Sequence, residues 1–388
     1  MRQHLLICSI LIGTAIGCSH PIPQHGPEMI SGQAFLKLWE APLAGPRDPI
    51  TSLYIRDTTL IAYTAKHSSF WLSAGEGAFL AQQQLAIGGE MVQPPVLLGD
   101  NIMVPSLLSV ARYTKSGKLV ATYPIPTAIQ SPATGAGNAM YFAVAHSGSG
   151  RLARYNLTDD GLKMVWEMYT SQGIVSGPVV LNDSVFVAGN DGKVFALTGR
   201  RDVLWNLPGD SFQTGGKVSA DLVVDDYGVY VASQDRQLYC LDRVTGKIRW
   251  SYYAPAPLLD APFVSSSHAY QFVPSLGIVA LDKLQGSQSR QPVWVQPLAQ
   301  QVLSVDETHV YVRAGGSILA LDKATGEIVF RSQRTDMTVC ATNTKDSTIY
   351  AATRNGTILA IKPILTPGKV GEVVFDEHIF QPLAMAGR

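Results

Sequence analysis

The chain has 388 residues, with 30 Lys and Arg against 30 Asp and Glu, so its formal net charge is zero. This balance, with only 15% charged residues, disfavours nucleic acid as a partner because polyanion binding usually needs a basic surplus. A hydrophobic content of 46% with 35 Gly and 23 Pro is typical of short strands joined by tight turns. It excludes a disordered or collagen-like chain.

The first residues have the pattern of a secretory signal. Arg2 and His4 precede the apolar run Leu5–Ile16, which is too short to cross a bilayer but fits the hydrophobic region of a signal peptide. The run ends in Ala15-Ile16-Gly17-Cys18, and small residues before a Cys resemble a bacterial lipobox. In proteins with that pattern, the signal peptidase cuts before the Cys, whose thiol carries a diacylglycerol. The resemblance therefore implies lipidation of Cys18.

The anchor has an alternative. Ala15 stands where a lipobox usually has Leu, and an ordinary secretory signal followed by an incidental Cys would give the same composition. The residue after the Cys is Ser19, and not the Asp that retains enterobacterial lipoproteins at the inner membrane. The resemblance thus implies a location at the outer membrane, facing the periplasm. The inner membrane is the alternative location. A lipid would be the only membrane contact, because no other apolar stretch is long enough to span a bilayer.

The sequence divides into four parts. Residues 19–34 are rich in Pro, Gly and polar residues without periodicity, which is typical of a flexible tether. We therefore expect a signal peptide, a lipidated Cys with its tether, a folded domain and a C-terminal tail, at residues 1–17, 18–35, 36–375 and 376–388.

A repeat of 40–44 residues runs through the folded domain. Leu241, Leu281 and Leu321 recur at one position of the repeat, each directly before an Asp. The same alignment continues to Trp71, Tyr113, Tyr155, Leu197 and Ile361. This count predicts eight units, with seven plus a degenerate first unit as the alternative.

Each unit has the pattern of four short strands. In one unit the expected strands are Pro178–Leu181, Ser184–Ala188, Lys193–Leu197 and Val203–Leu207. Asn190-Asp191-Gly192 separates the second from the third and supplies the positive φ angles of a tight hairpin. Four antiparallel strands per unit, with no helix between units, predict an all-β fold: an eight-bladed β-propeller.

One outer strand is surplus to eight blades. Candidates for the outer position run from Leu36–Glu40 (LKLWE) to Glu372–Phe375 (EVVF). We expect LKLWE to pair into the last blade and close the ring, because closure limits the exposed strand edges. The C-terminal segment is then a peripheral tail.

The pattern Asp-x-x-Thr-Gly recurs at the turn between third and fourth strands. The Asp can accept backbone N–H groups, the Thr adds a hydroxyl, and the Gly takes the left-handed conformation. An aromatic follows in the outer strand, where it either wedges between blades or contributes to an aromatic ligand box; repetition favours the wedge. Trp39, Trp166 and Trp205 fall in equivalent strands. The positions assigned this structural role are Asp242, Thr245, Gly246, Trp250, Asp282, Gly286, Trp294, Asp322, Thr325, Gly326 and Phe330.

These residues carry a family resemblance. The pattern A-x-D-x-x-T-G-x-x-x-W resembles the repeat of pyrroloquinoline-quinone-like (PQQ-like) propellers. Ala320–Gly326 matches it, Cys240–Trp250 matches with Cys in place of Ala, and Thr198 replaces the Asp in an earlier unit. The resemblance is specific over 190–362 and implies a β-propeller. The lipid anchor and the single domain are similar to members of this family that act in outer-membrane β-barrel assembly.

No catalytic set is evident. Quinoprotein members of the family carry an adjacent Cys-Cys pair, a catalytic Asp and Ca²⁺ ligands, whereas this chain has no Cys-Cys and none of the common zinc or hydrolase motifs. Cys240 and Cys340 are expected to be buried thiols and not a disulfide. We therefore predict a non-enzymatic protein without metal or PQQ. A quinoprotein-like enzyme and a carbohydrate-binding or sensor propeller are the alternatives.

Binding is then expected on loops. In an antiparallel blade, second-turn loops and blade-to-blade connectors share one face, and aromatic and Arg residues on loops are typical interface anchors. The alternative is that each residue packs over a blade end. The candidates are Tyr123, Tyr169, Phe212, Tyr252, Tyr253, Arg331 and Arg334. We expect a monomeric propeller that serves as an interaction scaffold for an envelope protein and binds no nucleic acid.

Overall fold

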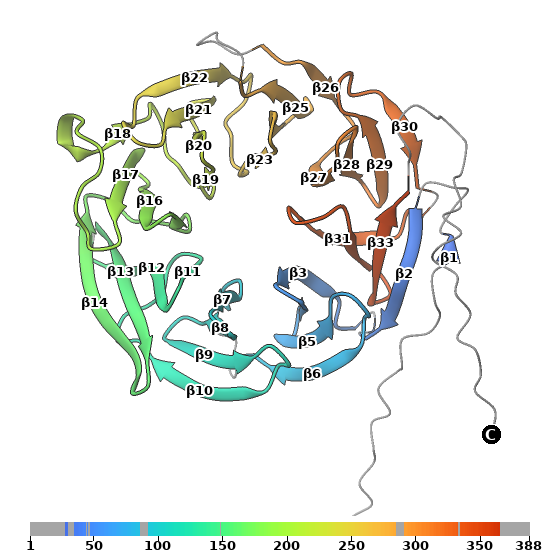
Figure 1. Cartoon of the computed structure of the whole chain (residues 1–388), viewed down its shortest axis with the longest axis horizontal. Helices are drawn as coiled ribbons and strands as arrows, with labels where there is room; N and C mark the ends of the chain where they lie inside the picture. The colour runs from blue at the N-terminus through green and yellow to red at the C-terminus, as the bar shows by residue number, and fades with distance from the viewer. Residues whose placement is uncertain are drawn as a thin grey trace, which may run out of the picture.

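The computed structural model describes residues 28–29, 35–43, 45, 47–85, 92–147, 149–284, 291–332 and 334–364. Over these ranges the chain forms eight antiparallel sheets arranged as a ring around a central axis (Figure 1). The eight-bladed all-β propeller is confirmed, and the seven-bladed alternative is excluded because the first unit forms a complete blade. None of the helical structure in these ranges has the length and apolar character that a membrane span requires.

Blades 1 to 4 follow in chain order, with the first strand of each innermost (Figure 1). Their strands are β3 (Ile50–Arg56), β4 (Thr59–Thr64), β5 (Ser68–Ser73) and β6 (Phe79–Gln84); β7 (Val96–Leu98), β8 (Asn101–Pro105), β9 (Ser109–Thr114) and β10 (Leu119–Pro124); β11 (Thr134–Ala136), β12 (Ala139–His146), β13 (Ser149–Thr158) and β14 (Gly161–Thr170); β15 (Val179–Leu181), β16 (Ser184–Ala188), β17 (Lys193–Thr198) and β18 (Phe212–Gln213).

Blades 5 to 8 repeat the arrangement. Their strands are β19 (Val223–Val224), β20 (Gly228–Ala232), β21 (Gln237–Asp242) and β22 (Ile248–Tyr253); β23 (Phe263–Val264), β24 (His268–Val273), β25 (Gly277–Asp282) and β26 (Trp294–Gln296); β27 (Gln301–Val305), β28 (His309–Ala314), β29 (Ser317–Asp322) and β30 (Ile328–Arg331); β31 (Met337–Ala341), β32 (Ile349–Thr353), β33 (Thr357–Pro363) and β2 (Phe35–Pro42), with β1 (Glu28–Met29) at the edge of β2.

The ring closes as the sequence predicts. Strand β2 pairs antiparallel with β33, so that Phe35 lies opposite Pro363 and Pro42 opposite Thr357. The strand begins one residue before the expected domain boundary, because Phe35 is fully buried against Tyr311 and Phe330. Strand β1, which lies in the segment expected to be a tether, pairs with the same strand. The signal peptide, Cys18 and the C-terminal tail lie outside the described residues.

The hydrophobic core lies between the blades. The described buried residues form eight clusters, one for each seam between neighbouring sheets. In β20, Tyr230 packs toward blade 6, whereas Val229 and Val231 pack toward blade 4. Because both faces of a blade are covered, its middle strands are apolar at consecutive positions and lack a polar face.

Blade 4 differs from the prediction in its outer strand. Val203 makes only an isolated bridge to Leu197, and the pairing with β17 resumes at β18. A single turn of 3₁₀ helix, Pro208–Asp210, separates the two parts. Pro208 has no N–H to donate to a ladder, and Gly209 has a φ of 71°, so the extended strand ends there. Trp205 is nevertheless fully buried in the seam to blade 5.

Candidate functional site

The antiparallel order gives the ring two chemically different faces. The turns between second and third strands lie with the blade-to-blade connectors: Ala254 N–H donates to Arg236 O, and Met337 N–H to Gly316 O. We call this the connector face. The remaining turns lie together on the opposite face, as the bond from Lys323 N–H to Thr308 O shows. We call it the motif face, because it carries the Asp-x-x-Thr-Gly turns.

The Asp-x-x-Thr-Gly turn is a closed set of hydrogen bonds. Asp242 Oδ1 accepts the N–H groups of Val244 at 3.1 Å and Thr245 at 2.8 Å, and the Thr245 hydroxyl at 2.9 Å. Gly246, with a φ of 71°, donates its N–H to Asp242 O. Asp242 Oδ2 pairs with Arg249 of the outer strand, so both carboxylate oxygens have protein partners and little capacity for a ligand.

The same geometry recurs in blade 7. Asp322 Oδ1 accepts the N–H of Thr325 at 2.8 Å and its hydroxyl at 3.1 Å, and Gly326 has a φ of 74°. The Thr325 N–H bond lowers the pKa of Asp322 below its ordinary value of 3.8. In blade 6, Asp282 accepts the N–H of Leu284 at 2.8 Å, and Gly286 lies outside the described residues.

Each outer-strand tryptophan crosses to the turn of the next blade. Trp294 Nε1 donates to Lys323 O at 2.9 Å, and a Cβ on Gly326 would lie 2.6 Å from the Trp294 ring. Trp250 Nε1 donates to Lys283 O at 3.1 Å. The other pairs are Trp39 with Ala74 O, Trp166 with Gly199 O and Trp205 with Arg243 O. Phe330 instead meets Phe35 edge to face, at 5.4 Å between ring centroids.

The sixth tryptophan wedges from a different strand. In blades 5 to 8 a small third-strand residue lies opposite the outer aromatic, as Ala280 lies opposite Trp294. In blade 1 the large residue is on the third strand and the small residue is on the outer strand. Trp71 on β5 lies opposite Ala81 and packs against Gly117 of blade 2. The alignment on Trp71 was therefore shifted by one residue, and Leu72 takes the position of Leu241. The size exchange disguised the register in the sequence.

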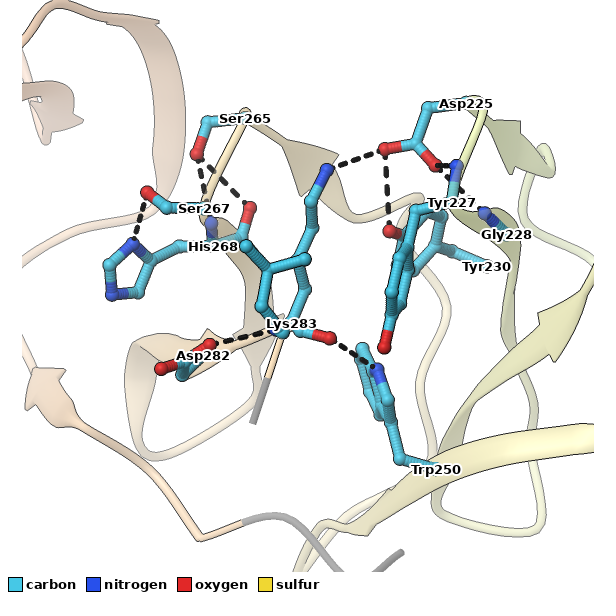
Figure 2. Close-up of polar contacts among 11 residues, drawn as sticks. Asp225, Tyr227, Gly228, Tyr230, Trp250, Ser265, Ser267, His268, Asp282 and Lys283 are labelled. Atoms are coloured by element: carbon cyan, nitrogen blue, oxygen red, sulfur yellow. Dashed lines mark hydrogen bonds and ion pairs between the residues drawn. The ribbon is translucent and has the colours of Figure 1, made fainter. Parts of the chain in front are cut away.

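A salt bridge joins blades 5 and 6 on the motif face (Figure 2). Lys283 Nζ lies 2.7 Å from Asp225 Oδ2, with the lysine side chain 7% and the aspartate side chain 30% exposed. Asp225 Oδ1 accepts the N–H groups of Tyr227 and Gly228, each at 2.9 Å. Lys283 O meanwhile holds the Trp250 indole (Figure 2). This cluster anchors the seam; its charges are already matched.

Two predicted contact residues are exposed at the connector-face ends of their strands. Tyr169 on β14 is 60% exposed and Tyr253 on β22 is 57% exposed. Arg151 lies over the Tyr169 ring at 5.9 Å, and Arg236 lies over the Tyr253 ring at 4.8 Å. A cation over each ring limits its motion, so both tyrosines present an ordered flat surface.

The other predicted contact residues are spread around the ring. Tyr252 is a correction: it is buried in the seam between blades 5 and 6, because neighbours in a strand point to opposite faces and Tyr253 takes the exposed one. Phe212 packs on Tyr239 at 5.3 Å, and Tyr123 is half-buried on β10. Arg331 is exposed on β30, and Arg334 pairs with Asp336. The seven residues form no single cluster.

Exposed aliphatic residues mark the connector face, and the sequence analysis did not single them out. They are Leu107 and Leu108 in a second turn, and Val175, Leu259 and Leu298 in connectors. Leu259 is 55% exposed and Leu298 is 49% exposed. Two such residues, Val244 and Leu284, lie in motif-face turns. Loops carry no periodic pattern, so only the three-dimensional structure distinguishes these side chains from buried ones.

A pocket of about 400 Å³ lies between blades 6 and 7. Asp260, Pro262 and Gln300 line it from the connectors, and Phe272 and Arg313 from the blades. A smaller pocket of about 170 Å³ lies between the same blades near motif-face turns that include Ser265 and Lys323. This seam therefore has room for another molecule's side chains.

The described residues contain no group of three or more His, Cys, Asp and Glu placed to hold a metal ion. Cys240 and Cys340 are both buried thiols outside any disulfide, as predicted. Burial raises the pKa of the Cys340 thiol to about 12. A thiol that is buried and protonated at neutral pH is a poor nucleophile, which agrees with a packing role for this residue.

Comparison with known proteins places the fold. A family model described as outer membrane protein assembly factor BamB matches residues 201–289 and 277–365. BamB from Moraxella catarrhalis has a similar structure, with a TM-score of 0.64 and 15% identity over 84% of this chain and 97% of that one. No curated protein matches the sequence.

Two other propellers align nearly as well. The computationally designed protein Ika8 has a TM-score of 0.62 and 14% identity, covering 82% of this chain and 98% of that chain. The C-terminal WD40 domain of Sif2 has a TM-score of 0.61 and 13% identity, covering 88% and 99%. At these sequence identities the structural likeness shows only that the fold is a propeller. The family match, in contrast, is a match to the sequence of the repeat. The chain is an eight-bladed β-propeller, and its residues 201–365 are similar to the PQQ-like repeat of the BamB family model.

Proposed function

We propose that this protein is a non-catalytic, lipid-anchored scaffold of the bacterial envelope that takes part in outer-membrane protein assembly. The observation that carries the proposal is the family match over residues 201–365, whose description is an outer-membrane assembly factor. The similar ring of the Moraxella catarrhalis protein agrees with it. The anchor would be Cys18, which follows the lipobox-like segment.

The two faces support a binding role. On the motif face, Asp242 is engaged in a turn and Lys283 in a seam. The connector face instead exposes Tyr169, Leu259 and Leu298, side chains whose burial against a partner would be favourable. We therefore assign partner contact to the connector face.

A non-enzymatic role is also supported by the residues present. The adjacent Cys-Cys of the quinoprotein members is missing from the sequence, and the two described thiols lie in separate blades. The tryptophans expected as a possible ligand box are engaged in seams by hydrogen bonds to the next blade.

The test is genetic and biochemical. Deletion of the gene in its own host should lower the amount of outer-membrane β-barrel proteins, and the wild-type chain should restore it. Cys18→Ser should release the protein from washed membranes and restore the barrel proteins poorly, because a soluble scaffold is no longer concentrated at the membrane. Unchanged barrel levels after deletion would reject the assembly role, and continued membrane attachment of Cys18→Ser would reject the anchor.

The alternatives give other results in the same strains. A quinone- or sugar-binding propeller predicts normal barrel proteins after deletion. It also predicts a change in tryptophan fluorescence when the purified chain is titrated with PQQ or with oligosaccharides. The scaffold proposal predicts no such saturable change.

A further inference from the structure

The pocket between blades 6 and 7 combines a cation with amide and aromatic groups. Its volume of about 400 Å³ is comparable with ligand pockets, which are roughly 300–1,000 Å³. Phe263 and Phe272 form part of its blade 6 wall, and Gln301 and Arg313 part of its blade 7 wall. A side chain that enters it would meet apolar rings on one side and hydrogen-bond donors on the other.

Arg313 is held in place with donor capacity remaining. Its Nε donates to Gln301 Oε1 at 3.3 Å, and its Nη1 donates to Gly315 O at 3.3 Å. The Gln301 amide is itself fixed by bonds to Cys340 O and to the Thr342 hydroxyl. Nη2 makes no hydrogen bond within the described ranges, so the guanidinium can receive a carboxylate without giving up its supports.

Exposed leucines flank the pocket in both connectors. Leu259 directly precedes the lining residue Asp260, and Leu298 lies two residues before Gln300. A small ligand confined to the pocket would leave both leucines in water. A chain that runs across the pocket would cover them, and this difference favours a polypeptide over a metabolite.

We propose that this pocket is the docking point for an extended segment of a partner protein. An acidic side chain of the segment enters toward Arg313, and apolar side chains on either side of it cover Leu259 and Leu298. Asp260, exposed in the connector, faces the segment with a negative charge and disfavours a second acidic residue next to the first. This inference rests on the proposed scaffold function and adds the location and the chemistry of the contact.

The test uses the detergent-purified full-length chain as bait for phage-displayed random peptides. Enriched sequences should carry one Asp or Glu between apolar residues. Synthetic, fluorescently labelled copies should bind Arg313→Gln about 10- to 100-fold more weakly than the wild type, the range for loss of one hydrogen bond to a charged group. Replacement of the acidic residue in the peptide by its amide should weaken binding by the same factor, without a further loss on Arg313→Gln.

The leucines have matched controls on the motif face. Leu259→Ser and Leu298→Ser should each weaken peptide binding by about tenfold, as expected for an exposed anchor. Val244→Ser and Leu284→Ser, which change residues that are more exposed than either leucine, should leave it unchanged. Circular dichroism checks that each variant is folded, and Arg313→Lys, which keeps the charge, should bind better than Arg313→Gln.

Other outcomes separate the two proposals. Enriched peptides without an acidic residue, or binding that Arg313→Gln leaves intact, would overturn the docking inference. So would binding that depends on Val244 and Leu284, although the scaffold function would then stand on the other face. If peptides bind at Arg313 but the deletion strain has normal amounts of barrel proteins, the docking inference stands and the assembly role is rejected.

Discussion

The contact between Trp294 and Gly326 offers a direct measure of how the blades lock together. Gly326 has a φ of 74°, and a Cβ there would lie 2.6 Å from the indole of the preceding blade. Gly326→Ala therefore adds two penalties, one for the backbone and one for the overlap. Gly315 separates them, because its φ is 59° and no atom lies within 4 Å of its Cβ position.

The two penalties have different sizes. A left-handed conformation costs a residue with a Cβ roughly 1–2 kcal/mol, and this is the whole expected cost of Gly315→Ala. Forcing a methyl group into a packed contact costs roughly 1–3 kcal/mol more. We expect Gly326→Ala to lower the free energy of unfolding by about 2–5 kcal/mol.

The assay is urea denaturation followed by circular dichroism, with a double-mutant cycle. Trp294→Ala alone should cost about 3–5 kcal/mol for the lost aromatic core. In the Trp294→Ala background the ring is absent, so Gly326→Ala should cost no more than Gly315→Ala does in the wild type. The reasoning is refuted if Gly326→Ala and Gly315→Ala are equally destabilising, or if removal of the indole leaves the cost of Gly326→Ala unchanged.

Three further outcomes follow from the same structure. Asp225→Asn, which takes the carboxylate from the mostly buried Lys283 ammonium, should cost about 1–3 kcal/mol, and more than Lys283→Met; urea midpoints in the opposite order would contradict the seam role. The Thr325 N–H lowers the pKa of Asp322 in the folded chain, so the contribution of Asp322 to stability is complete above the ordinary pKa of 3.8 and is lost as the pH falls through the lowered pKa. Asp322→Asn should therefore make the free energy of unfolding depend less on pH in acid. An unchanged acid profile would count against the turn geometry. Cys340, with a pKa of about 12, should react with iodoacetamide at pH 8 only once urea unfolds the chain, and equal labelling in the absence of urea would show that the thiol is exposed.

The sequence predicts the ring because its repeat is tied to backbone geometry. Turns that need a positive φ recur with Gly, as at Gly246 and Gly326, and these mark the ends of strands independently of packing. The ring closure through β2 followed from counting outer strands. In blade 1, the exchange of Trp71 and Ala81 kept the packing but shifted the apparent register by one residue.

The candidate site was less predictable. Tyr252 and Tyr253 are chemically alike, and only their alternation in β22 decides that one is buried and the other exposed. The predicted outer strand of blade 4 ends at Leu207, and its continuation in β18 was missed because it depends on pairing to β17. Arg313 and Leu259 come from different blades, so no local pattern connects them.

Photo-crosslinking in living cells tests the scaffold account most directly. A crosslinking amino acid is placed at the connector-face positions 259 and 298, and in parallel strains at the motif-face positions 244 and 284, all of which are exposed. The account predicts that the connector-face positions capture one and the same envelope protein, and that the motif-face positions capture none. Capture from the motif face alone, or equal capture from both faces, would contradict it.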